Sequence, residues 1–350
     1  DKVVLGIKAD TGAEKGGYSF EGPCALIDGK LEQVKSKKIK DKSNYPGNIK
    51  WLAIVDRYFM KSLIPLDDTN GAMKLSLDGN GILGNRFVGQ ESAIQPGTQK
   101  RFAYEIFFGP KSTQVLKDVG HDLGKAIHFG MFDIIAKPLL WFMNFIYGKI
   151  PNSGIAIIVL TILTKILLWP LGSKSYKSMS EMKRLQPLMA EIREKHKDDK
   201  KMMNQEIMSL YRTYKINPMG GCLPMILQIP VFFALYRMLY QAIELRHAPF
   251  FLWINDLSAP DRLFNFSFSI PFMQPPYGIP VLTVIMGATM LLQQKMSPPP
   301  GDPTQAKMMM LMPIVFTVIF INFSSGLVLY WLINNVLSIA QQTYIQKKYA

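Results

Sequence analysis

Lys165 is the residue whose type and position most directly suggest a function. It lies inside the apolar run ILTKILLWP, and a charged side chain at the centre of a membrane span costs about 2.5–3.5 kcal/mol. Thr161 lies one helical turn away on the same face and Thr164 adjoins the lysine, so we expect this face of the helix to be wet. A lone cation in such a pocket can attract a carboxylate. The alternative is that Lys165 extends to the headgroups of the inner leaflet.

Few other residues are suited to chemistry. The sequence has two cysteines, Cys24 and Cys222, and four scattered histidines, which excludes a disulfide framework and a cysteine-based metal cluster. The apolar segments lack the carboxylates that proton relays and ion-coupled transporters normally use. They also lack a histidine that would serve Ser324 or Ser325 as a base. We therefore expect a protein that is not an enzyme and that uses no cofactor and no metal. A channel or transporter is kept as an alternative function, and an intramembrane protease is less favoured.

Uncharged residues at membrane depth form a second group of candidates. Methionines crowd one stretch, at Met286, Met290, Met296, Met308, Met309, Met310 and Met312. Methionine is flexible and suits varied apolar partners, although it also serves as lipid-facing filler. Gln228, Asn334 and Asn335 carry polar groups that either join helices or contact a substrate. These features fit an adaptable apolar partner. Polypeptide segments with acidic residues are a ligand whose carboxylate Lys165 can attract.

The charges around these candidates divide the chain into regions. Residues 1–127 hold 19 Lys and Arg against 15 Asp and Glu, and residues 173–218 hold 11 against 6, out of 40 and 26 in the whole sequence. The predicted membrane spans lie outside these two blocks, at 154–171, 219–240, 279–294, 308–323 and 327–340. The last three are shorter than the about 20 residues that cross a bilayer. They therefore predict a bilayer that is thinned or locally wet.

Lysines and arginines in the loops predict the orientation of these spans. The 173–218 loop has 11 of them, whereas the 241–278 loop has only two. We therefore expect 173–218, 295–307 and the C-terminus in the cytoplasm, and the N-terminal region and 241–278 outside it. A polar domain outside needs an export signal, and the chain starts at Asp1 without one. The expectation is a missing N-terminal signal anchor, which would make six spans.

The charged N-terminal block and the segment after it predict two further elements. Residues 1–127 contain short alternating runs separated by turn formers such as Asp28-Gly29 and Asn70-Gly71, which predicts a β-sandwich that serves as a binding or spacer domain. Residues 128–151 are rich in aromatics, and their apolar core is too short to span. They predict an amphipathic helix in the membrane interface, with packing on the protein's own surface as the alternative. The core would then be 152–350.

The loop 173–218 within this core carries heptad-like apolar spacing. One run is Met182, Leu185, Met189 and Ile192, and the other is Met203, Ile207, Leu210 and Tyr214. Both runs follow a and d positions of a coiled coil, and charged residues at 197–200 separate them. The pattern predicts an antiparallel helical hairpin in the cytosol. It is either a docking platform or a solvated structural hairpin.

Several long segments resemble a known family. They are NPMGGCLPMILQIPVF (217–232), ELRHAPFFLWINDLSAPD (244–261), LQQKMSP (292–298), DPTQAKMMMLMP (302–313) and SSGLVLYWLINN (324–335). In this order they resemble the YidC membrane-protein insertases of the YidC/Oxa/Alb family over about 131–348. The region 1–127 is similar to the large periplasmic domain of the Gram-negative members, and we expect this domain and the first span to be truncated here.

The resemblance implies a mixed fold, with a helical membrane core, a periplasmic β domain and a cytoplasmic hairpin. The core would surround a hydrophilic groove that is open to the cytosol and to lipid. The implied groove residues are Lys165, Thr161, Gln228, Pro230, Phe232, Tyr330 and Trp331. Lys165 falls where the family usually has arginine, and lysine keeps the charge but loses the guanidinium fork. Trp331 falls where an aromatic side chain of the last span faces the substrate.

The resemblance also implies a function. Members insert and help fold proteins of the bacterial inner membrane without nucleotide hydrolysis. The implied partners are nascent membrane proteins, membrane lipids, the ribosome and targeting factors at the hairpin, and the Sec translocon.

Overall fold

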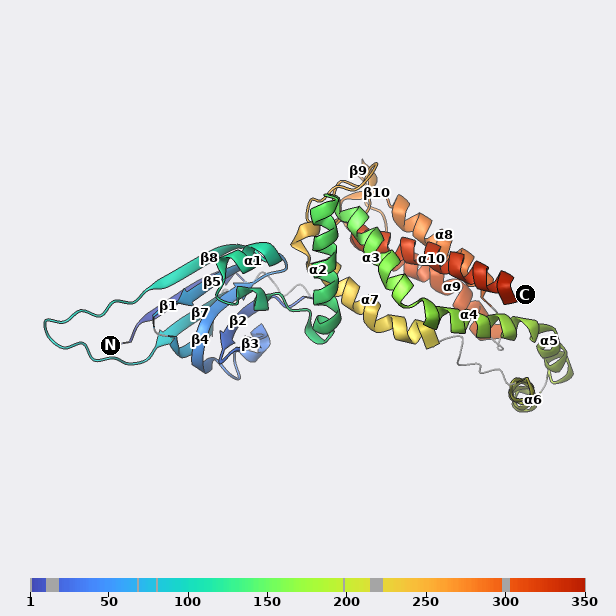
Figure 1. Cartoon of the computed structure of the whole chain (residues 1–350), viewed down its shortest axis with the longest axis horizontal. Coiled ribbons are helices and arrows are strands. Elements are labelled where there is room, and N and C mark those ends of the chain that lie inside the picture. The colour runs from blue at the N-terminus through green and yellow to red at the C-terminus, as the bar shows by residue number, and fades with distance from the viewer. Residues whose placement is uncertain are drawn as a thin grey trace. The chain divides into compact units, whose positions relative to one another are not determined.

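The computed structural model covers 1–350 and describes residues 2–10, 19–67, 69–79, 81–197, 199–214, 223–297 and 303–349. The chain forms two compact units. One comprises Asp1–Asp133 with Tyr240–Glu244, and the other comprises Ile134–Leu239 with Leu245–Ala350. Figure 1 shows that strands dominate the first unit and helices the second. Parts of the predicted features lie outside the described residues, namely 217–222 with Cys222, 298–302, and Asp198.

The first unit is built on antiparallel strands. They are β1 (Val4–Asp10), β2 (Gly22–Ile27), β3 (Lys30–Gln33), β4 (Asn44–Val55), β5 (Phe59–Pro65), β6 (Asn70–Leu77), β7 (Ile82–Gly89) and β8 (Tyr104–Pro110). The hydrogen-bonded order is β1-β7-β6-β4-β2-β3, and β5 pairs with both β4 and β8. This confirms the predicted N-terminal β-sheet domain.

The long strand β4 joins two groups of strands. Its first part, Asn44 to Asn48, pairs with β6, and its later residues pair with β2 and β5. Gly47 lies at this change of partner with a φ of 152°, and a Cβ there would come within 2.6 Å of Ile27. The two groups are thus one continuous network rather than the two separate sheets of a simple sandwich, because β4 runs through both.

Two apolar clusters hold this unit together. Ile7 and Phe87 of one strand group share a core with Leu52 and Leu63 of the other. On the far side of the second group, Trp51 and its neighbours pack under the short helices α1 (Thr113–Val119) and η2 (Leu123–Ala126). Burial of this apolar surface is the main source of stability for such a unit.

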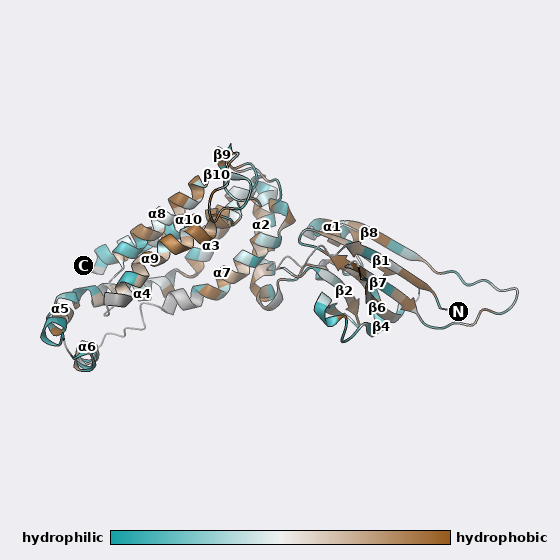
Figure 2. Cartoon of the chain, turned by 180° about the vertical axis from the view of Figure 1, so that it is seen from behind, coloured by the Kyte–Doolittle hydropathy of each residue, from teal (hydrophilic) through white to brown (hydrophobic). Residues whose placement is uncertain are grey.

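The second unit is mostly helical. Its helices are α2 (Asp133–Lys149), α3 (Ser153–Leu167), α4 (Trp169–Arg184), α5 (Gln186–Lys195), α6 (Lys200–Thr213), α7 (Leu223–Gln241), α8 (Val281–Met296), α9 (Pro303–Phe320) and α10 (Ser325–Tyr349). The short strands β9 (Leu263–Phe266) and β10 (Tyr277–Ile279) form a hairpin before α8. Helix α10 packs against α8, α3 and α4. Figure 2 shows hydrophobic residues along α3 and α8 and hydrophilic residues on α5 and α6.

Among the described residues, none of the helices is by itself both long enough and apolar enough to cross a membrane. Helices α3 and α4 meet both conditions together, across a bend of 65°.

This bend corrects the expectation of one continuous segment over 154–171. Helix α3 ends at Leu167 and α4 begins at Trp169, with Leu168 between them at φ −89° and ψ 1°. Pro170 is the second residue of α4. Proline has no N–H and clashes with the carbonyl four residues earlier. Lys165 therefore lies two residues before the end of α3, close to the bend, rather than deep inside a straight helix.

Helices α5 and α6 form a hairpin with its own apolar cluster. Leu185, Met189 and Ile207 are buried in it, and Ile192, Met203 and Leu210 pack against them. These are six residues of the predicted seam. Tyr214 is exposed because α6 ends at Thr213. Tyr211 packs there instead, and its hydroxyl donates to Met189 Sδ over 3.5 Å.

Helix α2 has apolar residues on two faces. Ala136, Leu140, Met143 and Ile146 are buried. Ile134, Trp141 and Phe145 are exposed, with Ile134 at 87%. The rings of Trp141 and Phe145 stack, with 5.8 Å between their centroids. An exposed aromatic stripe of this kind is typical of a helix that lies in a membrane interface.

Candidate functional site

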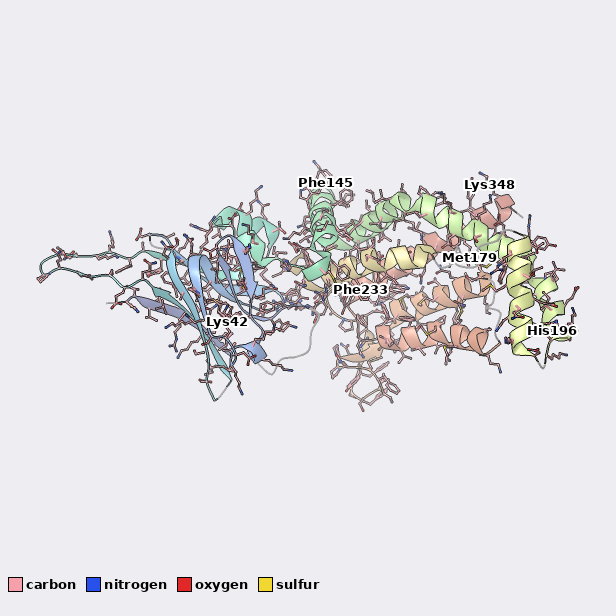
Figure 3. The ribbon with its side chains drawn as sticks, turned by 90° about the horizontal axis from the view of Figure 1, so that it is seen from below. Lys42, Phe145, Met179, His196, Phe233 and Lys348 are labelled. Carbon is pink, nitrogen blue, oxygen red and sulfur yellow. The ribbon has the colours of Figure 1, made fainter. Side chains whose placement is uncertain are left out.

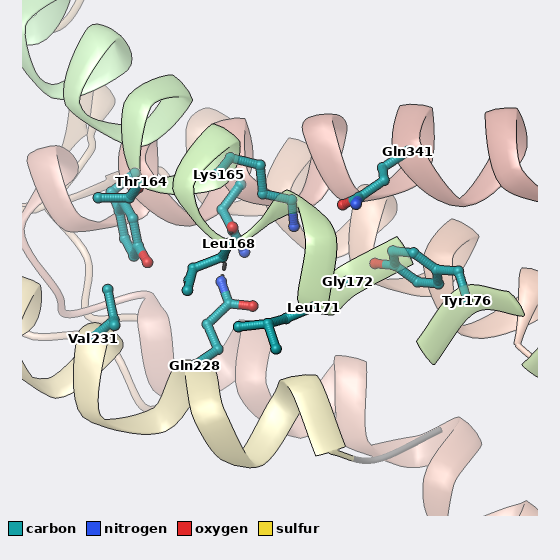
Figure 4. Close-up of a pocket in the computed structure, with 11 residues that line it drawn as sticks. Thr164, Lys165, Leu168, Leu171, Gly172, Tyr176, Gln228, Val231 and Gln341 are labelled. Carbon is teal, nitrogen blue, oxygen red and sulfur yellow. Dashed lines mark hydrogen bonds between the residues drawn. The ribbon is translucent and has the colours of Figure 1, made fainter. Parts of the chain in front are cut away.

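An open cleft lies where α3, α4, α7 and α10 meet. The space between its lining residues, including the open solvent at its mouth, is about 510 Å³. The lining residues are Thr164, Lys165, Leu168, Leu171, Gly172, Tyr176, Gln228, Val231, Tyr330, Asn334 and Gln341. Figure 4 shows that these side chains converge from all four helices. The lining therefore combines one cation with several uncharged polar groups and a few apolar side chains.

Lys165 supplies the charge of the cleft. Its Nζ donates to Ser338 Oγ over 2.6 Å, and the Ser338 hydroxyl donates in turn to the carbonyl of Asn334 over 2.7 Å. Tyr176 also hydrogen-bonds Ser338. No carboxylate of the described residues interacts with Lys165. The ammonium thus has a neutral partner and keeps the capacity to bind an anion.

Amides supply most of the remaining hydrogen bonds. Gln228 Nε2 donates to Asn334 Oδ1 over 2.9 Å, and Gln228 also hydrogen-bonds Tyr330. Near the other end, Gln341 Nε2 donates to the carbonyl of Trp169 over 3.1 Å. These bonds tie α10 to α7 and to the start of α4. The amide groups keep further donors and acceptors for a polar ligand.

Close approach of α4 and α10 depends on one glycine. A Cβ at Gly172 would lie 2.9 Å from Gln341 Nε2. The amide therefore reaches the backbone of α4 only because residue 172 has no side chain.

The structure brings together three of the seven residues expected in the groove. Lys165, Gln228 and Tyr330 line the cleft. Thr161 is buried, only 1% exposed, and its hydroxyl donates to the Ile157 carbonyl of its own helix over 2.6 Å. Thr164 lines the cleft in its place. The difference arises because α3 packs against α10, which covers the face that carries Thr161.

The other expected residues lie beside the cleft rather than in its lining. Phe232 and Trp331 meet edge to face, with 4.7 Å between ring centroids, and Phe320 meets Trp331 at 4.9 Å. Phe232 also stacks with Tyr330 at 6.5 Å, which joins this aromatic cluster to the cleft. Pro230 is exposed on α7. The result is a polar cleft with an adjoining aromatic wall.

Ser338, Tyr176 and Gln341 belong to the site but were not among the expected residues. A signal for two of them exists in the sequence. Tyr330, Asn334, Ser338 and Gln341 follow 4-4-3 spacing, which places them on one face of a helix. Tyr176 gave no such signal, because its position depends on the bend between α3 and α4.

Comparison with known proteins covers both units. The model of the 60Kd inner membrane protein family matches residues 145–350, and that of the YidC periplasmic domain matches residues 4–142. Proteins named "Membrane protein insertase YidC" are among the relatives. The one from Syntrophus aciditrophicus (strain SB) is 49% identical over 340 residues, which cover 97% of this chain and 60% of that protein.

A second relative and a solved structure are also similar to this chain. The protein of the same name from Geotalea uraniireducens (strain Rf4) is 49% identical over 333 residues, which cover 95% of this chain and 60% of that protein. The chain thus spans 60% of the length of these relatives. A solved structure described as "Active YidC insertase crystal structure with the first transmembrane domain resolved" has a TM-score of 0.49 and 23% identity, and the match covers 96% of this chain and 78% of that one. From the family models we conclude that the chain belongs to the 60Kd inner membrane protein family, as its resemblance to the YidC insertases predicted.

Proposed function

We propose that this chain inserts proteins into the bacterial inner membrane and helps them fold, with the cleft as the groove that receives the incoming segment. The observation that carries the proposal is the contact made by Lys165. Its ammonium lines an open polar cleft and is held by a neutral hydroxyl. A carboxylate entering the cleft gains a charge-assisted hydrogen bond that the resting site does not make.

Two of the helices that we propose as membrane spans are short. Helix α3 has 15 residues and α8 has 16, which correspond to roughly 22–24 Å against a hydrocarbon core of about 30 Å. Apolar side chains are exposed on α3, among them Ile166 and Leu167, and on α9, among them Leu311 and Ile314. We propose that α3, α7, α8, α9 and α10 are the five membrane spans, and that the bilayer beside them is thinned.

The proposed mechanism has an electrostatic and an apolar step. Lys165 attracts an acidic residue of the segment partway across the membrane, where low polarity strengthens the attraction. Gln228, Asn334 and Tyr330 can exchange hydrogen bonds with the polar backbone of the segment. The segment then leaves along the aromatic wall into lipid, and burial of its apolar side chains drives this step. No covalent chemistry, cofactor or metal takes part in this scheme.

We assign the other parts of the chain to different compartments. The domain 1–127 would be periplasmic. The helix within 128–151 would lie in the membrane interface, and the core 152–350 would follow it. The hairpin within 173–218 would be cytoplasmic and receive the ribosome and targeting factors. The Sec translocon is a further proposed partner. The apolar cluster of the hairpin supports a separate location for it, because α5 and α6 pack against each other through this cluster.

Site-directed photocrosslinking to a stalled nascent membrane protein tests the groove. The crosslinker replaces Thr164 or Gln228, which line the cleft, and Val336 serves as a control because it is exposed on α10 but does not line the cleft. We expect strong crosslinks from Thr164 and Gln228 and weak ones from Val336. Equal crosslinking from the three positions would contradict a groove at this place.

A deletion tests the hairpin. Removing 186–213 with a short flexible linker should abolish insertion while the thermal stability of the remaining chain changes little. Normal insertion by the deletion variant would show that the hairpin only connects α4 to α7.

A further inference from the structure

The segment that carries β9 and β10 has an unusual composition for a loop. Residues 263–280 contain no Asp, Glu, Lys, Arg or His, and they include Phe264, Phe266, Phe268 and Phe272. We call residues 263–279 the aromatic loop. Connecting segments that meet only water are normally polar and variable in conformation. The composition of the aromatic loop therefore indicates that part of it meets an apolar environment.

The phenylalanines of the aromatic loop point outward. Phe264 is 68% exposed, Phe268 is 62% exposed and Phe272 is 81% exposed. The rings of Phe266 and Phe268 stack, with 5.2 Å between centroids and 7° between planes. Exposed apolar patches of this kind mark a surface that binds something apolar.

The backbone is arranged to present these side chains. Phe264 has a φ of 58° and Phe272 a φ of 63°. Bulky residues rarely adopt this left-handed conformation, and it persists only where the surrounding structure holds it. The fold thus maintains an unfavourable backbone at two positions whose side chains are exposed and apolar.

Arg262 and Asn322 hold the aromatic loop in place. Arg262 Nε donates to the Pro276 carbonyl over 2.7 Å, and its Nη1 donates to the Ile321 carbonyl over 2.8 Å. Asn322 Nδ2 donates to the Phe272 carbonyl over 2.8 Å, and Asn322 Oδ1 accepts from the Gln274 N–H over 2.8 Å. Because Ile321 and Asn322 lie between α9 and α10, these bonds fix the loop relative to the ends of the helices.

The aromatic loop lies at the same end of the helical unit as α2. Figure 1 shows both elements at that end, and Figure 3 shows them on opposite sides of the bundle, with Phe145 of α2 pointing outward. Two exposed aromatic surfaces at one level on opposite sides match the belt that membrane proteins place at the boundary between lipid and water.

We propose that Phe264, Phe268 and Phe272 insert into the headgroup region of the phospholipid leaflet at this end of the bundle. The proposal rests on the proposed function in one respect, that the helices lie in a bilayer. The aromatic loop and α2 then fix the depth of the short helices from both sides. The charge-free composition favours a lipid surface over a soluble protein partner, whose interface would normally include a polar rim.

Fluorescence quenching of the full chain in phosphatidylethanolamine and phosphatidylglycerol vesicles tests this. A Cys222→Ser background is used, and Cys24 is retained because burial raises the pKa of its thiol to about 12 and keeps it unreactive. Phe268→Cys carries an environment-sensitive probe, and Asn265→Cys provides a second position on the same hairpin without loss of an apolar side chain. Leu311→Cys on α9 reports the membrane, and Met208→Cys on α6 reports water.

We expect probes at 268 and 265 to be quenched more by nitroxide lipids labelled near the headgroup than by those labelled at the chain end. Aqueous iodide should quench the probe at 268 roughly threefold less than the probe at 208. Equal iodide quenching at 268 and 208, with lipid quenching intact at 311, would overturn the loop proposal alone. Absence of lipid quenching at 311 would overturn the membrane assignment. Shielding of 268 from both lipid and iodide would mean a protein covers the loop, and would also overturn the proposal.

Discussion

Two cations of the helical unit, Lys165 and Arg262, differ in what their charged groups contact. The ammonium of Lys165 donates to one neutral hydroxyl, that of Ser338. The guanidinium of Arg262 donates to four backbone carbonyls and to Asn322 Oδ1. A charge held by many fixed acceptors stabilises the fold, whereas a charge with one neutral partner stays available to a ligand. In the proposed function, this difference separates a structural cation, Arg262, from one that acts on the substrate, Lys165.

The surroundings explain why each residue type suits its place. The planar fork of arginine satisfies several carbonyls at once, which suits a loop whose backbone groups lack partners in a regular sheet. Lysine is a compact charge on a flexible stem, which suits attraction of a moving carboxylate. In this account Lys165 and Arg262 are not interchangeable, and variants at four positions test that claim.

Arg262→Ala should have the largest effect on stability. It leaves the carbonyls of Pro276 and Ile321 without their donor, so we expect the free energy of unfolding to fall by about 2–4 kcal/mol. Thermal unfolding of the detergent-purified protein measures this, with Lys165→Ala as the matched control. Lys165→Ala should cost less than about 1 kcal/mol. Equal losses for the two variants would remove the distinction between the cations.

Lys165→Ala should reduce insertion of a substrate with an acidic tail by roughly tenfold to a hundredfold, since a charge-assisted hydrogen bond contributes about 1.5–3 kcal/mol. Lys165→Arg should retain most of the activity because it keeps the charge. Protease protection of the inserted tail in proteoliposomes is the measurement. A substrate without acidic residues in its tail is the control and should be affected much less by either change. Loss of activity in the arginine variant would show that charge alone is not sufficient.

Asn322→Ala should have a smaller effect than Arg262→Ala. It removes two hydrogen bonds to the aromatic loop, but the groups involved are exposed and water can replace the side chain, so we expect a loss of about 1 kcal/mol. Amide exchange of residues 270–276 should become faster. The variant Asn265→Ala, which changes an exposed side chain of β9, should leave this exchange rate unaltered.

Ser338→Ala should have the smallest effect. The Lys165 ammonium loses its hydroxyl partner, but water in the open cleft can accept the same hydrogen bond. We expect insertion to change by less than about twofold and the free energy of unfolding by about 0.5 kcal/mol. A loss as large as that of Lys165→Ala would assign the role of Lys165 to the pair rather than to the charge.

The sequence predicted Lys165 as the central residue because a charge inside an apolar run stands out without any knowledge of the fold. It also predicted the β-sheet domain, whose alternating runs are local. Thr161 was expected in the groove from its position one turn before Lys165. Its burial against α10 could not be foreseen, because it depends on which face of α3 the last helix covers.

Long-range contacts account for most of what the sequence did not reveal. The bend at Leu168 follows from Pro170, yet the apolar run 154–171 concealed it. Ser338 lies 173 positions from Lys165, and Ile321 lies 59 positions from Arg262. Hydrophobic periodicity describes neighbours along one helix and carries no information about such partners.

A charge exchange tests the central claim most directly. Lys165→Glu is combined either with a substrate that carries acidic residues in its short tail or with the same substrate in which these residues are changed to lysine. If Lys165 acts by attracting a carboxylate, Lys165→Glu should fail with the acidic tail and recover insertion with the basic tail, and the unchanged protein should show the opposite preference. Normal insertion of the acidic tail by Lys165→Glu would contradict the account, because the charge in the cleft would then have no role in drawing the segment across.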